Sequence, residues 1–415
     1  MNKRFLRRAL AALLLLTSYI LLLTSQACSP EPPLHLYDAQ AAETDLPLID
    51  LDLDVYWDYD TEFDIDYYWR SEWYYGWDET DKQIFGELGY TEPKVYELRR
   101  YYTNSTPYAP HTSVISDMVE GNRYSGTYNW GFWDLLVWNQ ITTLDGVQSL
   151  HFDEQTSLDS VTAYTNPSMH VSRYQAPRYT NSFYAPEPLF AAYEQAIDVN
   201  RDLRGFVYDA EHKVWRRTLR TLLKPITYIY LTQVILHNNN GRINAINGDA
   251  SLSGLARSTT LNTGRGGEDA ITVYYNMRMK RNMPLVPFGS RQRGTTTDNS
   301  TTGSNGVVEP EVVDIIGGRL MTFGICNLRA NEITRTEEVA DPYRHYMDLT
   351  MQFNNGIDST FVFDVTHQVR RHFRGGVITV ELNVDTIPIP SRKGGSGFDA
   401  VVKDFEDGGT HEFEM

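Results

Sequence analysis

Cys28 has the most distinctive chemistry in this chain of 415 residues, which contains only two cysteines. It follows four basic residues between positions 3 and 8 and an almost continuously apolar run from Ala9 to Leu23. Basic residues, an apolar core and then small residues form the order of a secretory signal. The apolar run is too short and too one-sided for a stable membrane span, which needs about 20 apolar residues. The sequence therefore places Cys28 at a point of signal processing.

The tetrapeptide that ends at Cys28, Ser-Gln-Ala-Cys, resembles a bacterial lipobox, whose cysteine becomes the acylated N-terminus. Ser25 stands where leucine is usual, and Gln26 is larger than the usual small residue. Two alternatives stay open: an ordinary signal peptide cut before a chance cysteine, and an N-terminal membrane anchor. We expect a lipoprotein signal peptide over residues 1–27 and lipid attachment at Cys28, because several acyl chains anchor far better than one.

The second cysteine, Cys326, lies in the apolar sequence LMTFGICNL. Since Cys28 is expected to carry lipid, Cys326 has no partner for a disulfide. A small apolar side chain in such surroundings is typical of a buried structural thiol.

Three aspartates at alternate positions, Asp50, Asp52 and Asp54, have the oxygen ligands of a calcium loop. However, the glycine which that loop requires would fall on Val55, and Thr61 stands where its closing glutamate is needed. In a strand, alternate spacing puts the aspartates on one face and the apolar residues between them on the other. The pattern favours a strand and predicts no metal site.

The stretch 62–81, EFDIDYYWRSEWYYGWDETD, is acidic and aromatic without a clean period, which indicates a long excursion from a sandwich. Exposed Trp and Tyr rings could stack on sugar rings. Alternatively, the rings cover one end of a domain, because large aromatic side chains mostly serve packing. The second interpretation is favoured.

The motifs that would carry catalysis are missing. H-E-x-x-H, C-x-x-C, G-x-S-x-G and the P-loop do not occur, and TGRGGED lacks the third glycine of a dinucleotide loop. The histidines considered are scattered singly: His151, His170, His237, His345, His367 and His372. A glycosidase pair of carboxylates stays open, because only their separation in space would reveal it. We expect no enzyme, no cofactor and no metal.

The net charge of the chain indicates which classes of partner it can bind. The chain has 37 Lys and Arg against 54 Asp and Glu, and loss of residues 1–27 removes four basic and no acidic residues, which leaves a net charge of −21. Such a surface repels nucleic acid and anionic lipid as a whole. No nucleic-acid partner is therefore expected.

Many short apolar stretches separated by turns, with few helical patterns, predict an all-β protein built from β-sandwiches. Residues 28–48 begin with a proline-rich stretch, Pro30, Pro32 and Pro33, and are expected to form a flexible tether. The remaining length suits two domains. We place an N-terminal β-sandwich at 49–215 and a C-terminal β-sandwich at 216–415, joined near VWRRTLRTLLK.

The sequence makes a specific prediction for each of four further segments. Ala185–Ile197 is predicted as a short helix or turn, and Ile226–Leu236, ITYIYLTQVIL, as a strand. Ser290–Gly306 is polar and of low complexity, so we expect a mobile loop that proteases cut first. The C-terminal sequence GFDAVVKDFEDGGTHEFEM alternates like a strand, and pairing within its own domain is favoured.

The order of several segments is similar to that in a known family. They are DLDVYWDYD, APEPLFAAYEQAIDV, ITYIYLTQVIL with GDASLSGLA, FDVTHQV, and the glycine-rich lead into an acidic end. This order resembles the fimbrillin-associated surface lipoproteins of Bacteroidales, specifically the DUF5119 group, which are akin to anchor and accessory subunits of the FimB and Mfa2 type. The resemblance covers nearly the whole mature chain, most clearly Ile226–Met415, and the aromatic stretch 62–81 departs from it.

The resemblance implies two tandem transthyretin-like, or fimbrillin-like, β-sandwiches, an outer-membrane lipid anchor and a role in fimbrial assembly or adhesion. Fimbrillin-like partners would bind by strand exchange, in which a sheet edge accepts a neighbour's strand. We expect a surface-exposed subunit held by lipid on Cys28. Cleavage after Arg70 would detach the body from that lipid and is disfavoured. The alternative is a surface glycan-binding lipoprotein of a nutrient-uptake system.

Overall fold

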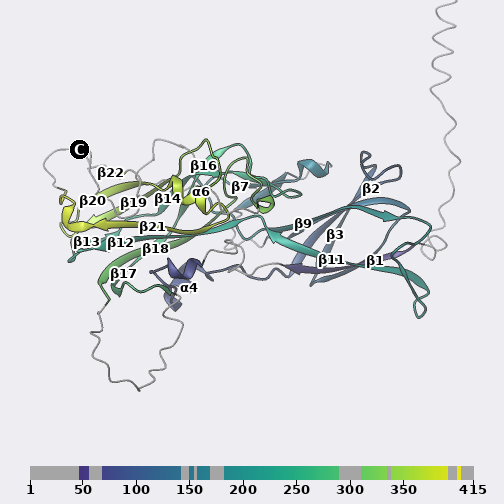
Figure 1. Cartoon of the computed structure of the whole chain (residues 1–415), viewed down its shortest axis with the longest axis horizontal. Helices are drawn as coiled ribbons and strands as arrows, with labels where there is room; N and C mark the ends of the chain where they lie inside the picture. Colours follow the sequence, from purple (N-terminus) through teal and green to yellow (C-terminus); the bar gives the residue numbers. More distant parts are fainter. Residues whose placement is uncertain are drawn as a thin grey trace, which may run out of the picture.

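The computed structural model describes residues 46–55, 68–141, 149–153, 157–168, 182–288, 310–333, 338–390 and 400–402. The expected signal peptide, Cys28 and the polar loop Ser290–Gly306 lie outside these residues. The described chain is mostly β, with several sheets arranged in two halves (Figure 1). Its helical elements are α4 (Glu79–Phe85), α6 (Thr366–Arg371), η1 (Trp69–Ser71), η2 (Leu158–Ser160), η3 (Ala330–Glu332) and η4 (Val384–Thr386).

The first half is built on one large sheet that curls into a near-barrel. Its strand order is β3-β2-β5-β9-β11-β1-β4, with β10 beside β11. β1 runs parallel to β11 and antiparallel to β4. The strands are β1 (Leu48–Val55), β2 (Val95–Thr103), β3 (Ser113–Glu120), β4 (Arg123–Thr127), β5 (Gly131–Asn139), β9 (Phe190–Val199), β10 (Val207–Asp209) and β11 (Val214–Pro225).

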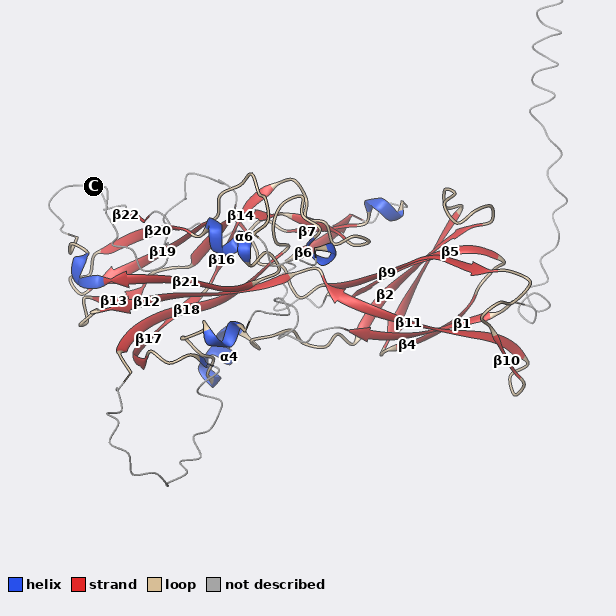
Figure 2. Ribbon diagram, in the orientation of Figure 1, coloured by secondary structure: helices blue, strands red, loops and turns tan. Residues whose placement is uncertain are grey.

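The second half packs two sheets face to face (Figure 2). One has the order β17-β18-β12-β21, and the other has the order β22-β20-β19-β14-β16-β8, with β13 beside β19. The first comprises β12 (Tyr228–His237), β17 (Met277–Pro284), β18 (Val312–Thr322) and β21 (Gly376–Asn383). The second comprises β8 (Ser182–Phe183), β13 (Ile243–Ile246), β14 (Ala250–Ala256), β16 (Ala270–Tyr275), β19 (Tyr346–Phe353), β20 (Asp358–Asp364) and β22 (Ala400–Val402).

A small third sheet joins segments from both predicted domains. Its order is β15-β7-β6, with bounds β6 (Leu150–Asp153), β7 (Thr162–Thr165) and β15 (Ser258–Thr260). β8 likewise pairs with β16 of the second half. β11 runs unbroken across the expected boundary between residues 215 and 216, and that boundary stays a prediction.

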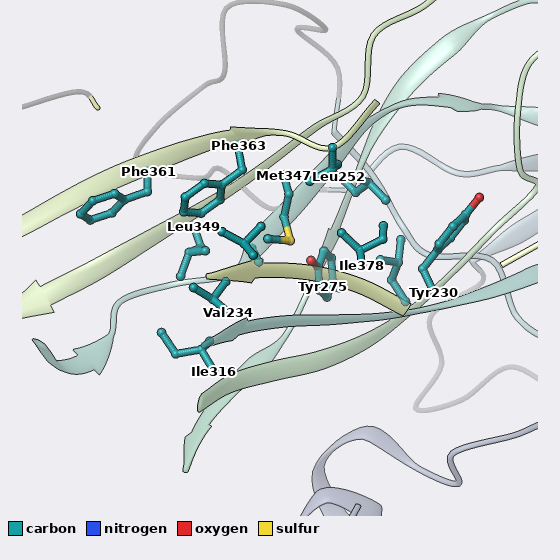
Figure 3. Packing of buried hydrophobic residues seen from close by; sticks show 14 of the residues in the cluster. Tyr230, Val234, Leu252, Tyr275, Ile316, Met347, Leu349, Phe361, Phe363 and Ile378 are labelled. Atoms are coloured by element: carbon teal, nitrogen blue, oxygen red, sulfur yellow. The ribbon is translucent and has the colours of Figure 1, made fainter. Parts of the chain in front are cut away.

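The central strand β12 explains why the sequence around it is apolar at nearly every position. Tyr230 and Val234 face the interior between the two sheets, together with Phe361 and other residues of the opposite sheet (Figure 3). Ile229 and Leu231 point the other way and belong to the core that continues into the first half. A strand covered on both faces needs an apolar run rather than alternation.

The prediction of a helix or turn over Ala185–Ile197 is wrong, because most of this segment is strand β9. Ala and Glu favour helices locally, but β9 pairs with both β5 and β11. Its side chains Phe190, Ile197 and Val199 are buried. Tertiary pairing and burial therefore override the local preference.

His237, the last residue of β12, links three strands of the first sheet of the second half. Its Nδ1 lies 2.8 Å from Glu311, just before β18, and its Nε2 lies 3.4 Å from Glu381 on β21. These carboxylates, Glu381 and then Glu311, raise the pKa of His237 to about 9 and outweigh its partial burial. The charged imidazolium thus stabilises the fold fully below the ordinary pKa of 6.5, and this contribution is lost as the pH rises through about 9.

We therefore expect the free energy of unfolding to fall by about 1 kcal/mol more in the wild type than in His237→Gln between pH 6.5 and pH 9.5. This figure is discounted for the solvent exposure of both glutamates. Urea unfolding of both proteins at the two pH values measures the difference. An identical pH dependence in the two proteins would contradict the assigned role.

Candidate assembly surfaces

Strand β1 has the two faces that its sequence predicts. Ile49, Leu51 and Leu53 are at most 2% exposed and belong to the core of the first half. Asp50 and Asp52 point to the outer face of the sheet, where each lies beside an arginine of a neighbouring strand. The strand interpretation is confirmed for Leu48–Val55.

The outer charges tie β1 to both neighbours. Asp50 lies 3.2 Å from Arg216 of β11, and Asp52 lies 3.6 Å from Arg123 of β4. Arg216 also contacts Asp209 of β10 at 3.0 Å. Because these ion pairs join specific positions on adjacent strands, they favour one register. Asp50 and Asp52 thus each pair with an arginine in this structure.

The aromatic segment, residues 68–90, lies on the outer face of the sheet that contains β12 (Figure 1). Trp69, Trp73 and Tyr75 are buried there. Gly317 of β18 makes room for one of these rings, since a Cβ at this position would lie 2.3 Å from Cγ of Tyr75. The packing interpretation of this stretch therefore holds for these rings, which are not accessible to a sugar.

The backbone of the aromatic segment is fixed by Gln233 of β12. The Gln233 Oε1 accepts hydrogen bonds from the backbone N–H groups of Tyr74 and Tyr75 at 2.9 and 3.1 Å, and its Nε2 donates to the carbonyl of Glu72 at 2.7 Å. Gln233 is fully buried. A polar residue inside an apolar strand is thus explained by an irregular segment whose backbone groups need partners.

A buried cluster of charges holds α4 against β17. Asp81 is fully buried and lies 2.5 Å from Lys280 and 2.8 Å from Arg278. Asp78, the N-cap of α4, contacts the same two cations at 3.1 and 3.0 Å. Burial disfavours the charge of Asp78, but the N–H of Asp81 and the cations Lys280 and Arg278 outweigh it and hold the pKa of Asp78 below its usual range.

Arg70, the candidate cleavage position, lies within the turn η1 at the start of the aromatic segment. The Ser71 N–H and hydroxyl both donate to the carbonyl of Tyr68, and the Trp73 N–H donates to the carbonyl of Trp69. Trp69 is buried beside Phe288. The bond after Arg70 is therefore part of a folded turn.

The C-terminal strand β22 lies at one edge of the larger sheet of the second half. It runs parallel to β20, with Ala400 opposite Phe361 and Val402 opposite Phe363. Pairing of this segment with a strand of the second half, as the favoured interpretation expects, is thus present for residues 400–402. The residues beyond Val402 lie outside the described chain.

Of the two cysteines, only Cys326 is within the described residues, and it is buried and free. Burial, with the nearby charges of Asp341 and Asp269, raises the pKa of its thiol to about 12. Cys326 is thus a structural side chain, as expected. The expected lipid site at Cys28 stays a prediction.

The histidines within the described ranges do not converge on one site. His345 pairs with a carboxylate: its Nε2 lies 2.7 Å from Asp341, with both side chains fully buried. Its Nδ1 donates to the carbonyl of Ser253 at 3.1 Å, so the ring joins two segments of the second domain. The signal for this pair is the i, i+4 spacing within DPYRH. His170 lies outside the described residues.

Neither a metal site nor a membrane-spanning helix is found in the part of the chain that the structure describes. There, no group of three or more His, Cys, Asp or Glu could hold a metal ion. No helix within the same ranges is long and apolar enough to cross a membrane.

Comparison with known proteins gives distant structural similarities. No family model matches the chain, and no curated protein matches it. A candidate adhesin from Bacteroides ovatus is 12% identical, with a TM-score of 0.43 over 82% of this chain and 94% of that one. A candidate adhesin from Bacteroides thetaiotaomicron is 9% identical, with a TM-score of 0.41 over 82% and 93%.

The fimbrial anchor protein Mfa2 from Porphyromonas gingivalis is also similar to this chain. It is 9% identical, with a TM-score of 0.32 over 88% of this chain and 95% of that one. Similarity at this level shows neither the partners nor the activity of this chain.

Proposed function

We propose that the protein is a lipid-anchored, surface-exposed subunit of fimbrial type that keeps its first strand and receives or caps a polymer. The observation that carries this proposal is the position of β1. It follows the expected tether from Cys28 and lies between β11 and β4, hydrogen-bonded to both. A lipid on Cys28 would thus be connected, through the tether, to a strand that is paired on both sides within the first sheet.

The fold of the Arg70 turn supports retention of β1. A protease needs an extended and accessible chain around the bond that it cuts. Here the neighbouring Trp69 and Trp73 are buried, and the turn between them is hydrogen-bonded. Cleavage after Arg70 therefore requires local unfolding, and the anchor on Cys28 would stay attached to the body.

The proposed fold is two tandem transthyretin-like β-sandwiches, at 49–215 and 216–415. Fimbrillin-like subunits are the proposed partners, bound by strand addition to a sheet edge. The edges in the described chain include β3 and β4 in the first half and β17 in the second. An unpaired edge presents backbone N–H and C=O groups to an incoming strand.

A glycan-binding role has less support. It rested on aromatic rings in 62–81, and three of those that the structure describes, Trp69, Trp73 and Tyr75, are buried against the second half. Stacking on a sugar needs an exposed ring face. We therefore rank the fimbrial role first.

The start of the mature chain in its native membrane tests the proposal. We expect mass spectrometry of the outer-membrane protein to find a blocked, acylated N-terminal Cys28 and an intact Arg70–Ser71 bond. As a control, Arg70→Ala should give the same mature protein, since no cleavage is expected there. A free N-terminus at Ser71 would instead identify a processed, polymerising subunit.

A further inference from the structure

Exposed apolar side chains gather at one end of the first half. Val207 and Tyr208 of β10 are 73% and 49% exposed, and Trp215 of β11 is 40% exposed. Tyr208 and Trp215 face each other across the two strands, with ring centroids 5.3 Å apart. Tyr108, in the loop between β2 and β3, is 80% exposed. We call these four residues the end patch.

Strand pairing places all four residues at the same end of the sheet. β10 follows the end of β9 at Val199, and Val199 lies opposite Gly131 at the start of β5. The next residue of β5, Phe132, lies opposite Thr103 at the end of β2, just before the loop of Tyr108. Figure 2 shows β10 at the end of the first half that points away from the second half.

The same end receives the N-terminal segment. Leu48, the first residue of β1, lies opposite Arg216, and Val207 lies opposite Arg216 on the other side of β11. Only 20 residues separate Leu48 from Cys28 in the sequence. A flexible tether, as proposed for residues 28–48, would have an end-to-end distance of roughly 25 Å. A lipid on Cys28 would therefore hold the end patch close to the bilayer.

The local charge also differs from that of the whole chain. Residues 200–217 contain five basic and three acidic residues, whereas the whole chain has 37 basic against 54 acidic. One of the three acids, Asp209, is paired with both Arg216 and His212. Three further cations of this stretch, Arg201, Arg204 and Lys213, are exposed.

We propose that the end patch docks on the surface of the bilayer that carries the lipid anchor. Trp and Tyr rings are enriched at membrane–water interfaces, where one end of the ring is apolar and the other is wet. Basic residues close to anionic headgroups add roughly 1 kcal/mol each. The contact rests on the proposed anchoring, because the tether gives the patch a high effective concentration at the membrane. It would fix how the first half stands on the cell surface.

Vesicle binding without the lipid tests the end patch separately from the anchor. The full mature chain with Cys28→Ser, which cannot be acylated, is floated with vesicles of phosphatidylethanolamine and phosphatidylglycerol at millimolar lipid. We expect measurable binding that weakens with salt, and binding at least tenfold weaker in the double variant Tyr208→Ser/Trp215→Ser. Met118→Ser and Leu222→Ser, exposed apolar residues of β3 and β11 outside the patch, are matched controls and should bind like the parent.

Tryptophan fluorescence shows whether the Trp215 ring itself contacts the lipid. Brominated lipid should quench part of the tryptophan fluorescence of the parent protein, and Trp215→Phe should remove that quenching while binding falls less than tenfold. Equal binding by the parent and the double variant, or no binding by the parent, overturns the proposal. So does a photo-crosslinker at Tyr208 that captures a second protein chain in native membranes and no lipid. Failure of the anchor would appear elsewhere, as an absence of fatty acid on Cys28.

Discussion

Replacement of Asp81 by alanine is expected to lower the free energy of unfolding by about 3–5 kcal/mol, because it leaves the buried Lys280 ammonium with only its longer ion pair, to Asp78 at 3.1 Å. Lys280 is 8% exposed, and its shortest ion pair, 2.5 Å, is with Asp81. The same substitution removes the acceptor for the Tyr75 hydroxyl, which donates to Asp81 at 2.8 Å. Urea unfolding, followed by circular dichroism and tryptophan fluorescence, measures the loss.

Two further variants isolate the cause. Glu79→Ala, two residues away in the same helix, breaks an exposed ion pair with Lys82 at 3.2 Å and should change the free energy of unfolding by less than about 1 kcal/mol. The double variant Asp81→Leu/Lys280→Met should recover most of the loss, since it removes both buried charges together. If Asp81→Ala costs no more than Glu79→Ala, the charge cluster does not hold the aromatic segment in place.

Cys28→Ala is expected to abolish fatty-acid labelling of the protein completely and to remove it from the outer-membrane fraction. The reason is that each CH₂ of an acyl chain buried in the bilayer contributes about 0.8 kcal/mol. Several acyl chains therefore hold the protein in the membrane far more strongly than the end patch alone can. Cells are grown with a clickable fatty-acid analogue, and the outer membrane is washed with carbonate to strip peripheral protein.

The second cysteine supplies the control for that experiment. Cys326→Ala should be labelled and located like the wild type, because Cys326 is buried and its thiol is protonated at neutral pH. Full labelling of Cys28→Ala would show that Cys28 is not the lipid site. Loss of the label in Cys326→Ala would contradict the structural role assigned to that thiol.

The aromatic segment gives the second half a cover that its own strands do not provide. β12 is apolar on both faces, and its outer face would meet solvent without Trp73 and Tyr75. The segment lies before β2 in the sequence, so it ties the first half to the second. The outer face of this sheet is therefore presented to the surroundings by the aromatic segment and not by β12 itself.

Local patterns in the sequence determined the features that depend on neighbouring residues. The alternation in β1 placed Asp50 and Asp52 on one face and leucines on the other, since side chains in a strand alternate with a period of two. The continuous apolar run of β12 indicated a strand. The apolar neighbours of Cys326 in the sequence indicated that its thiol is buried.

Only the tertiary structure decided the features that depend on distant pairing. β9 is a strand because β5 and β11 pair with it, although its composition suits a helix. Asp81 and Lys280 meet across 199 residues, and Gln233 binds a backbone segment about 160 residues away. The period and composition of a segment encode which of its faces is apolar, but they carry no information about which distant segment will cover that face. That choice is made by packing and by the need of each buried polar group for a partner.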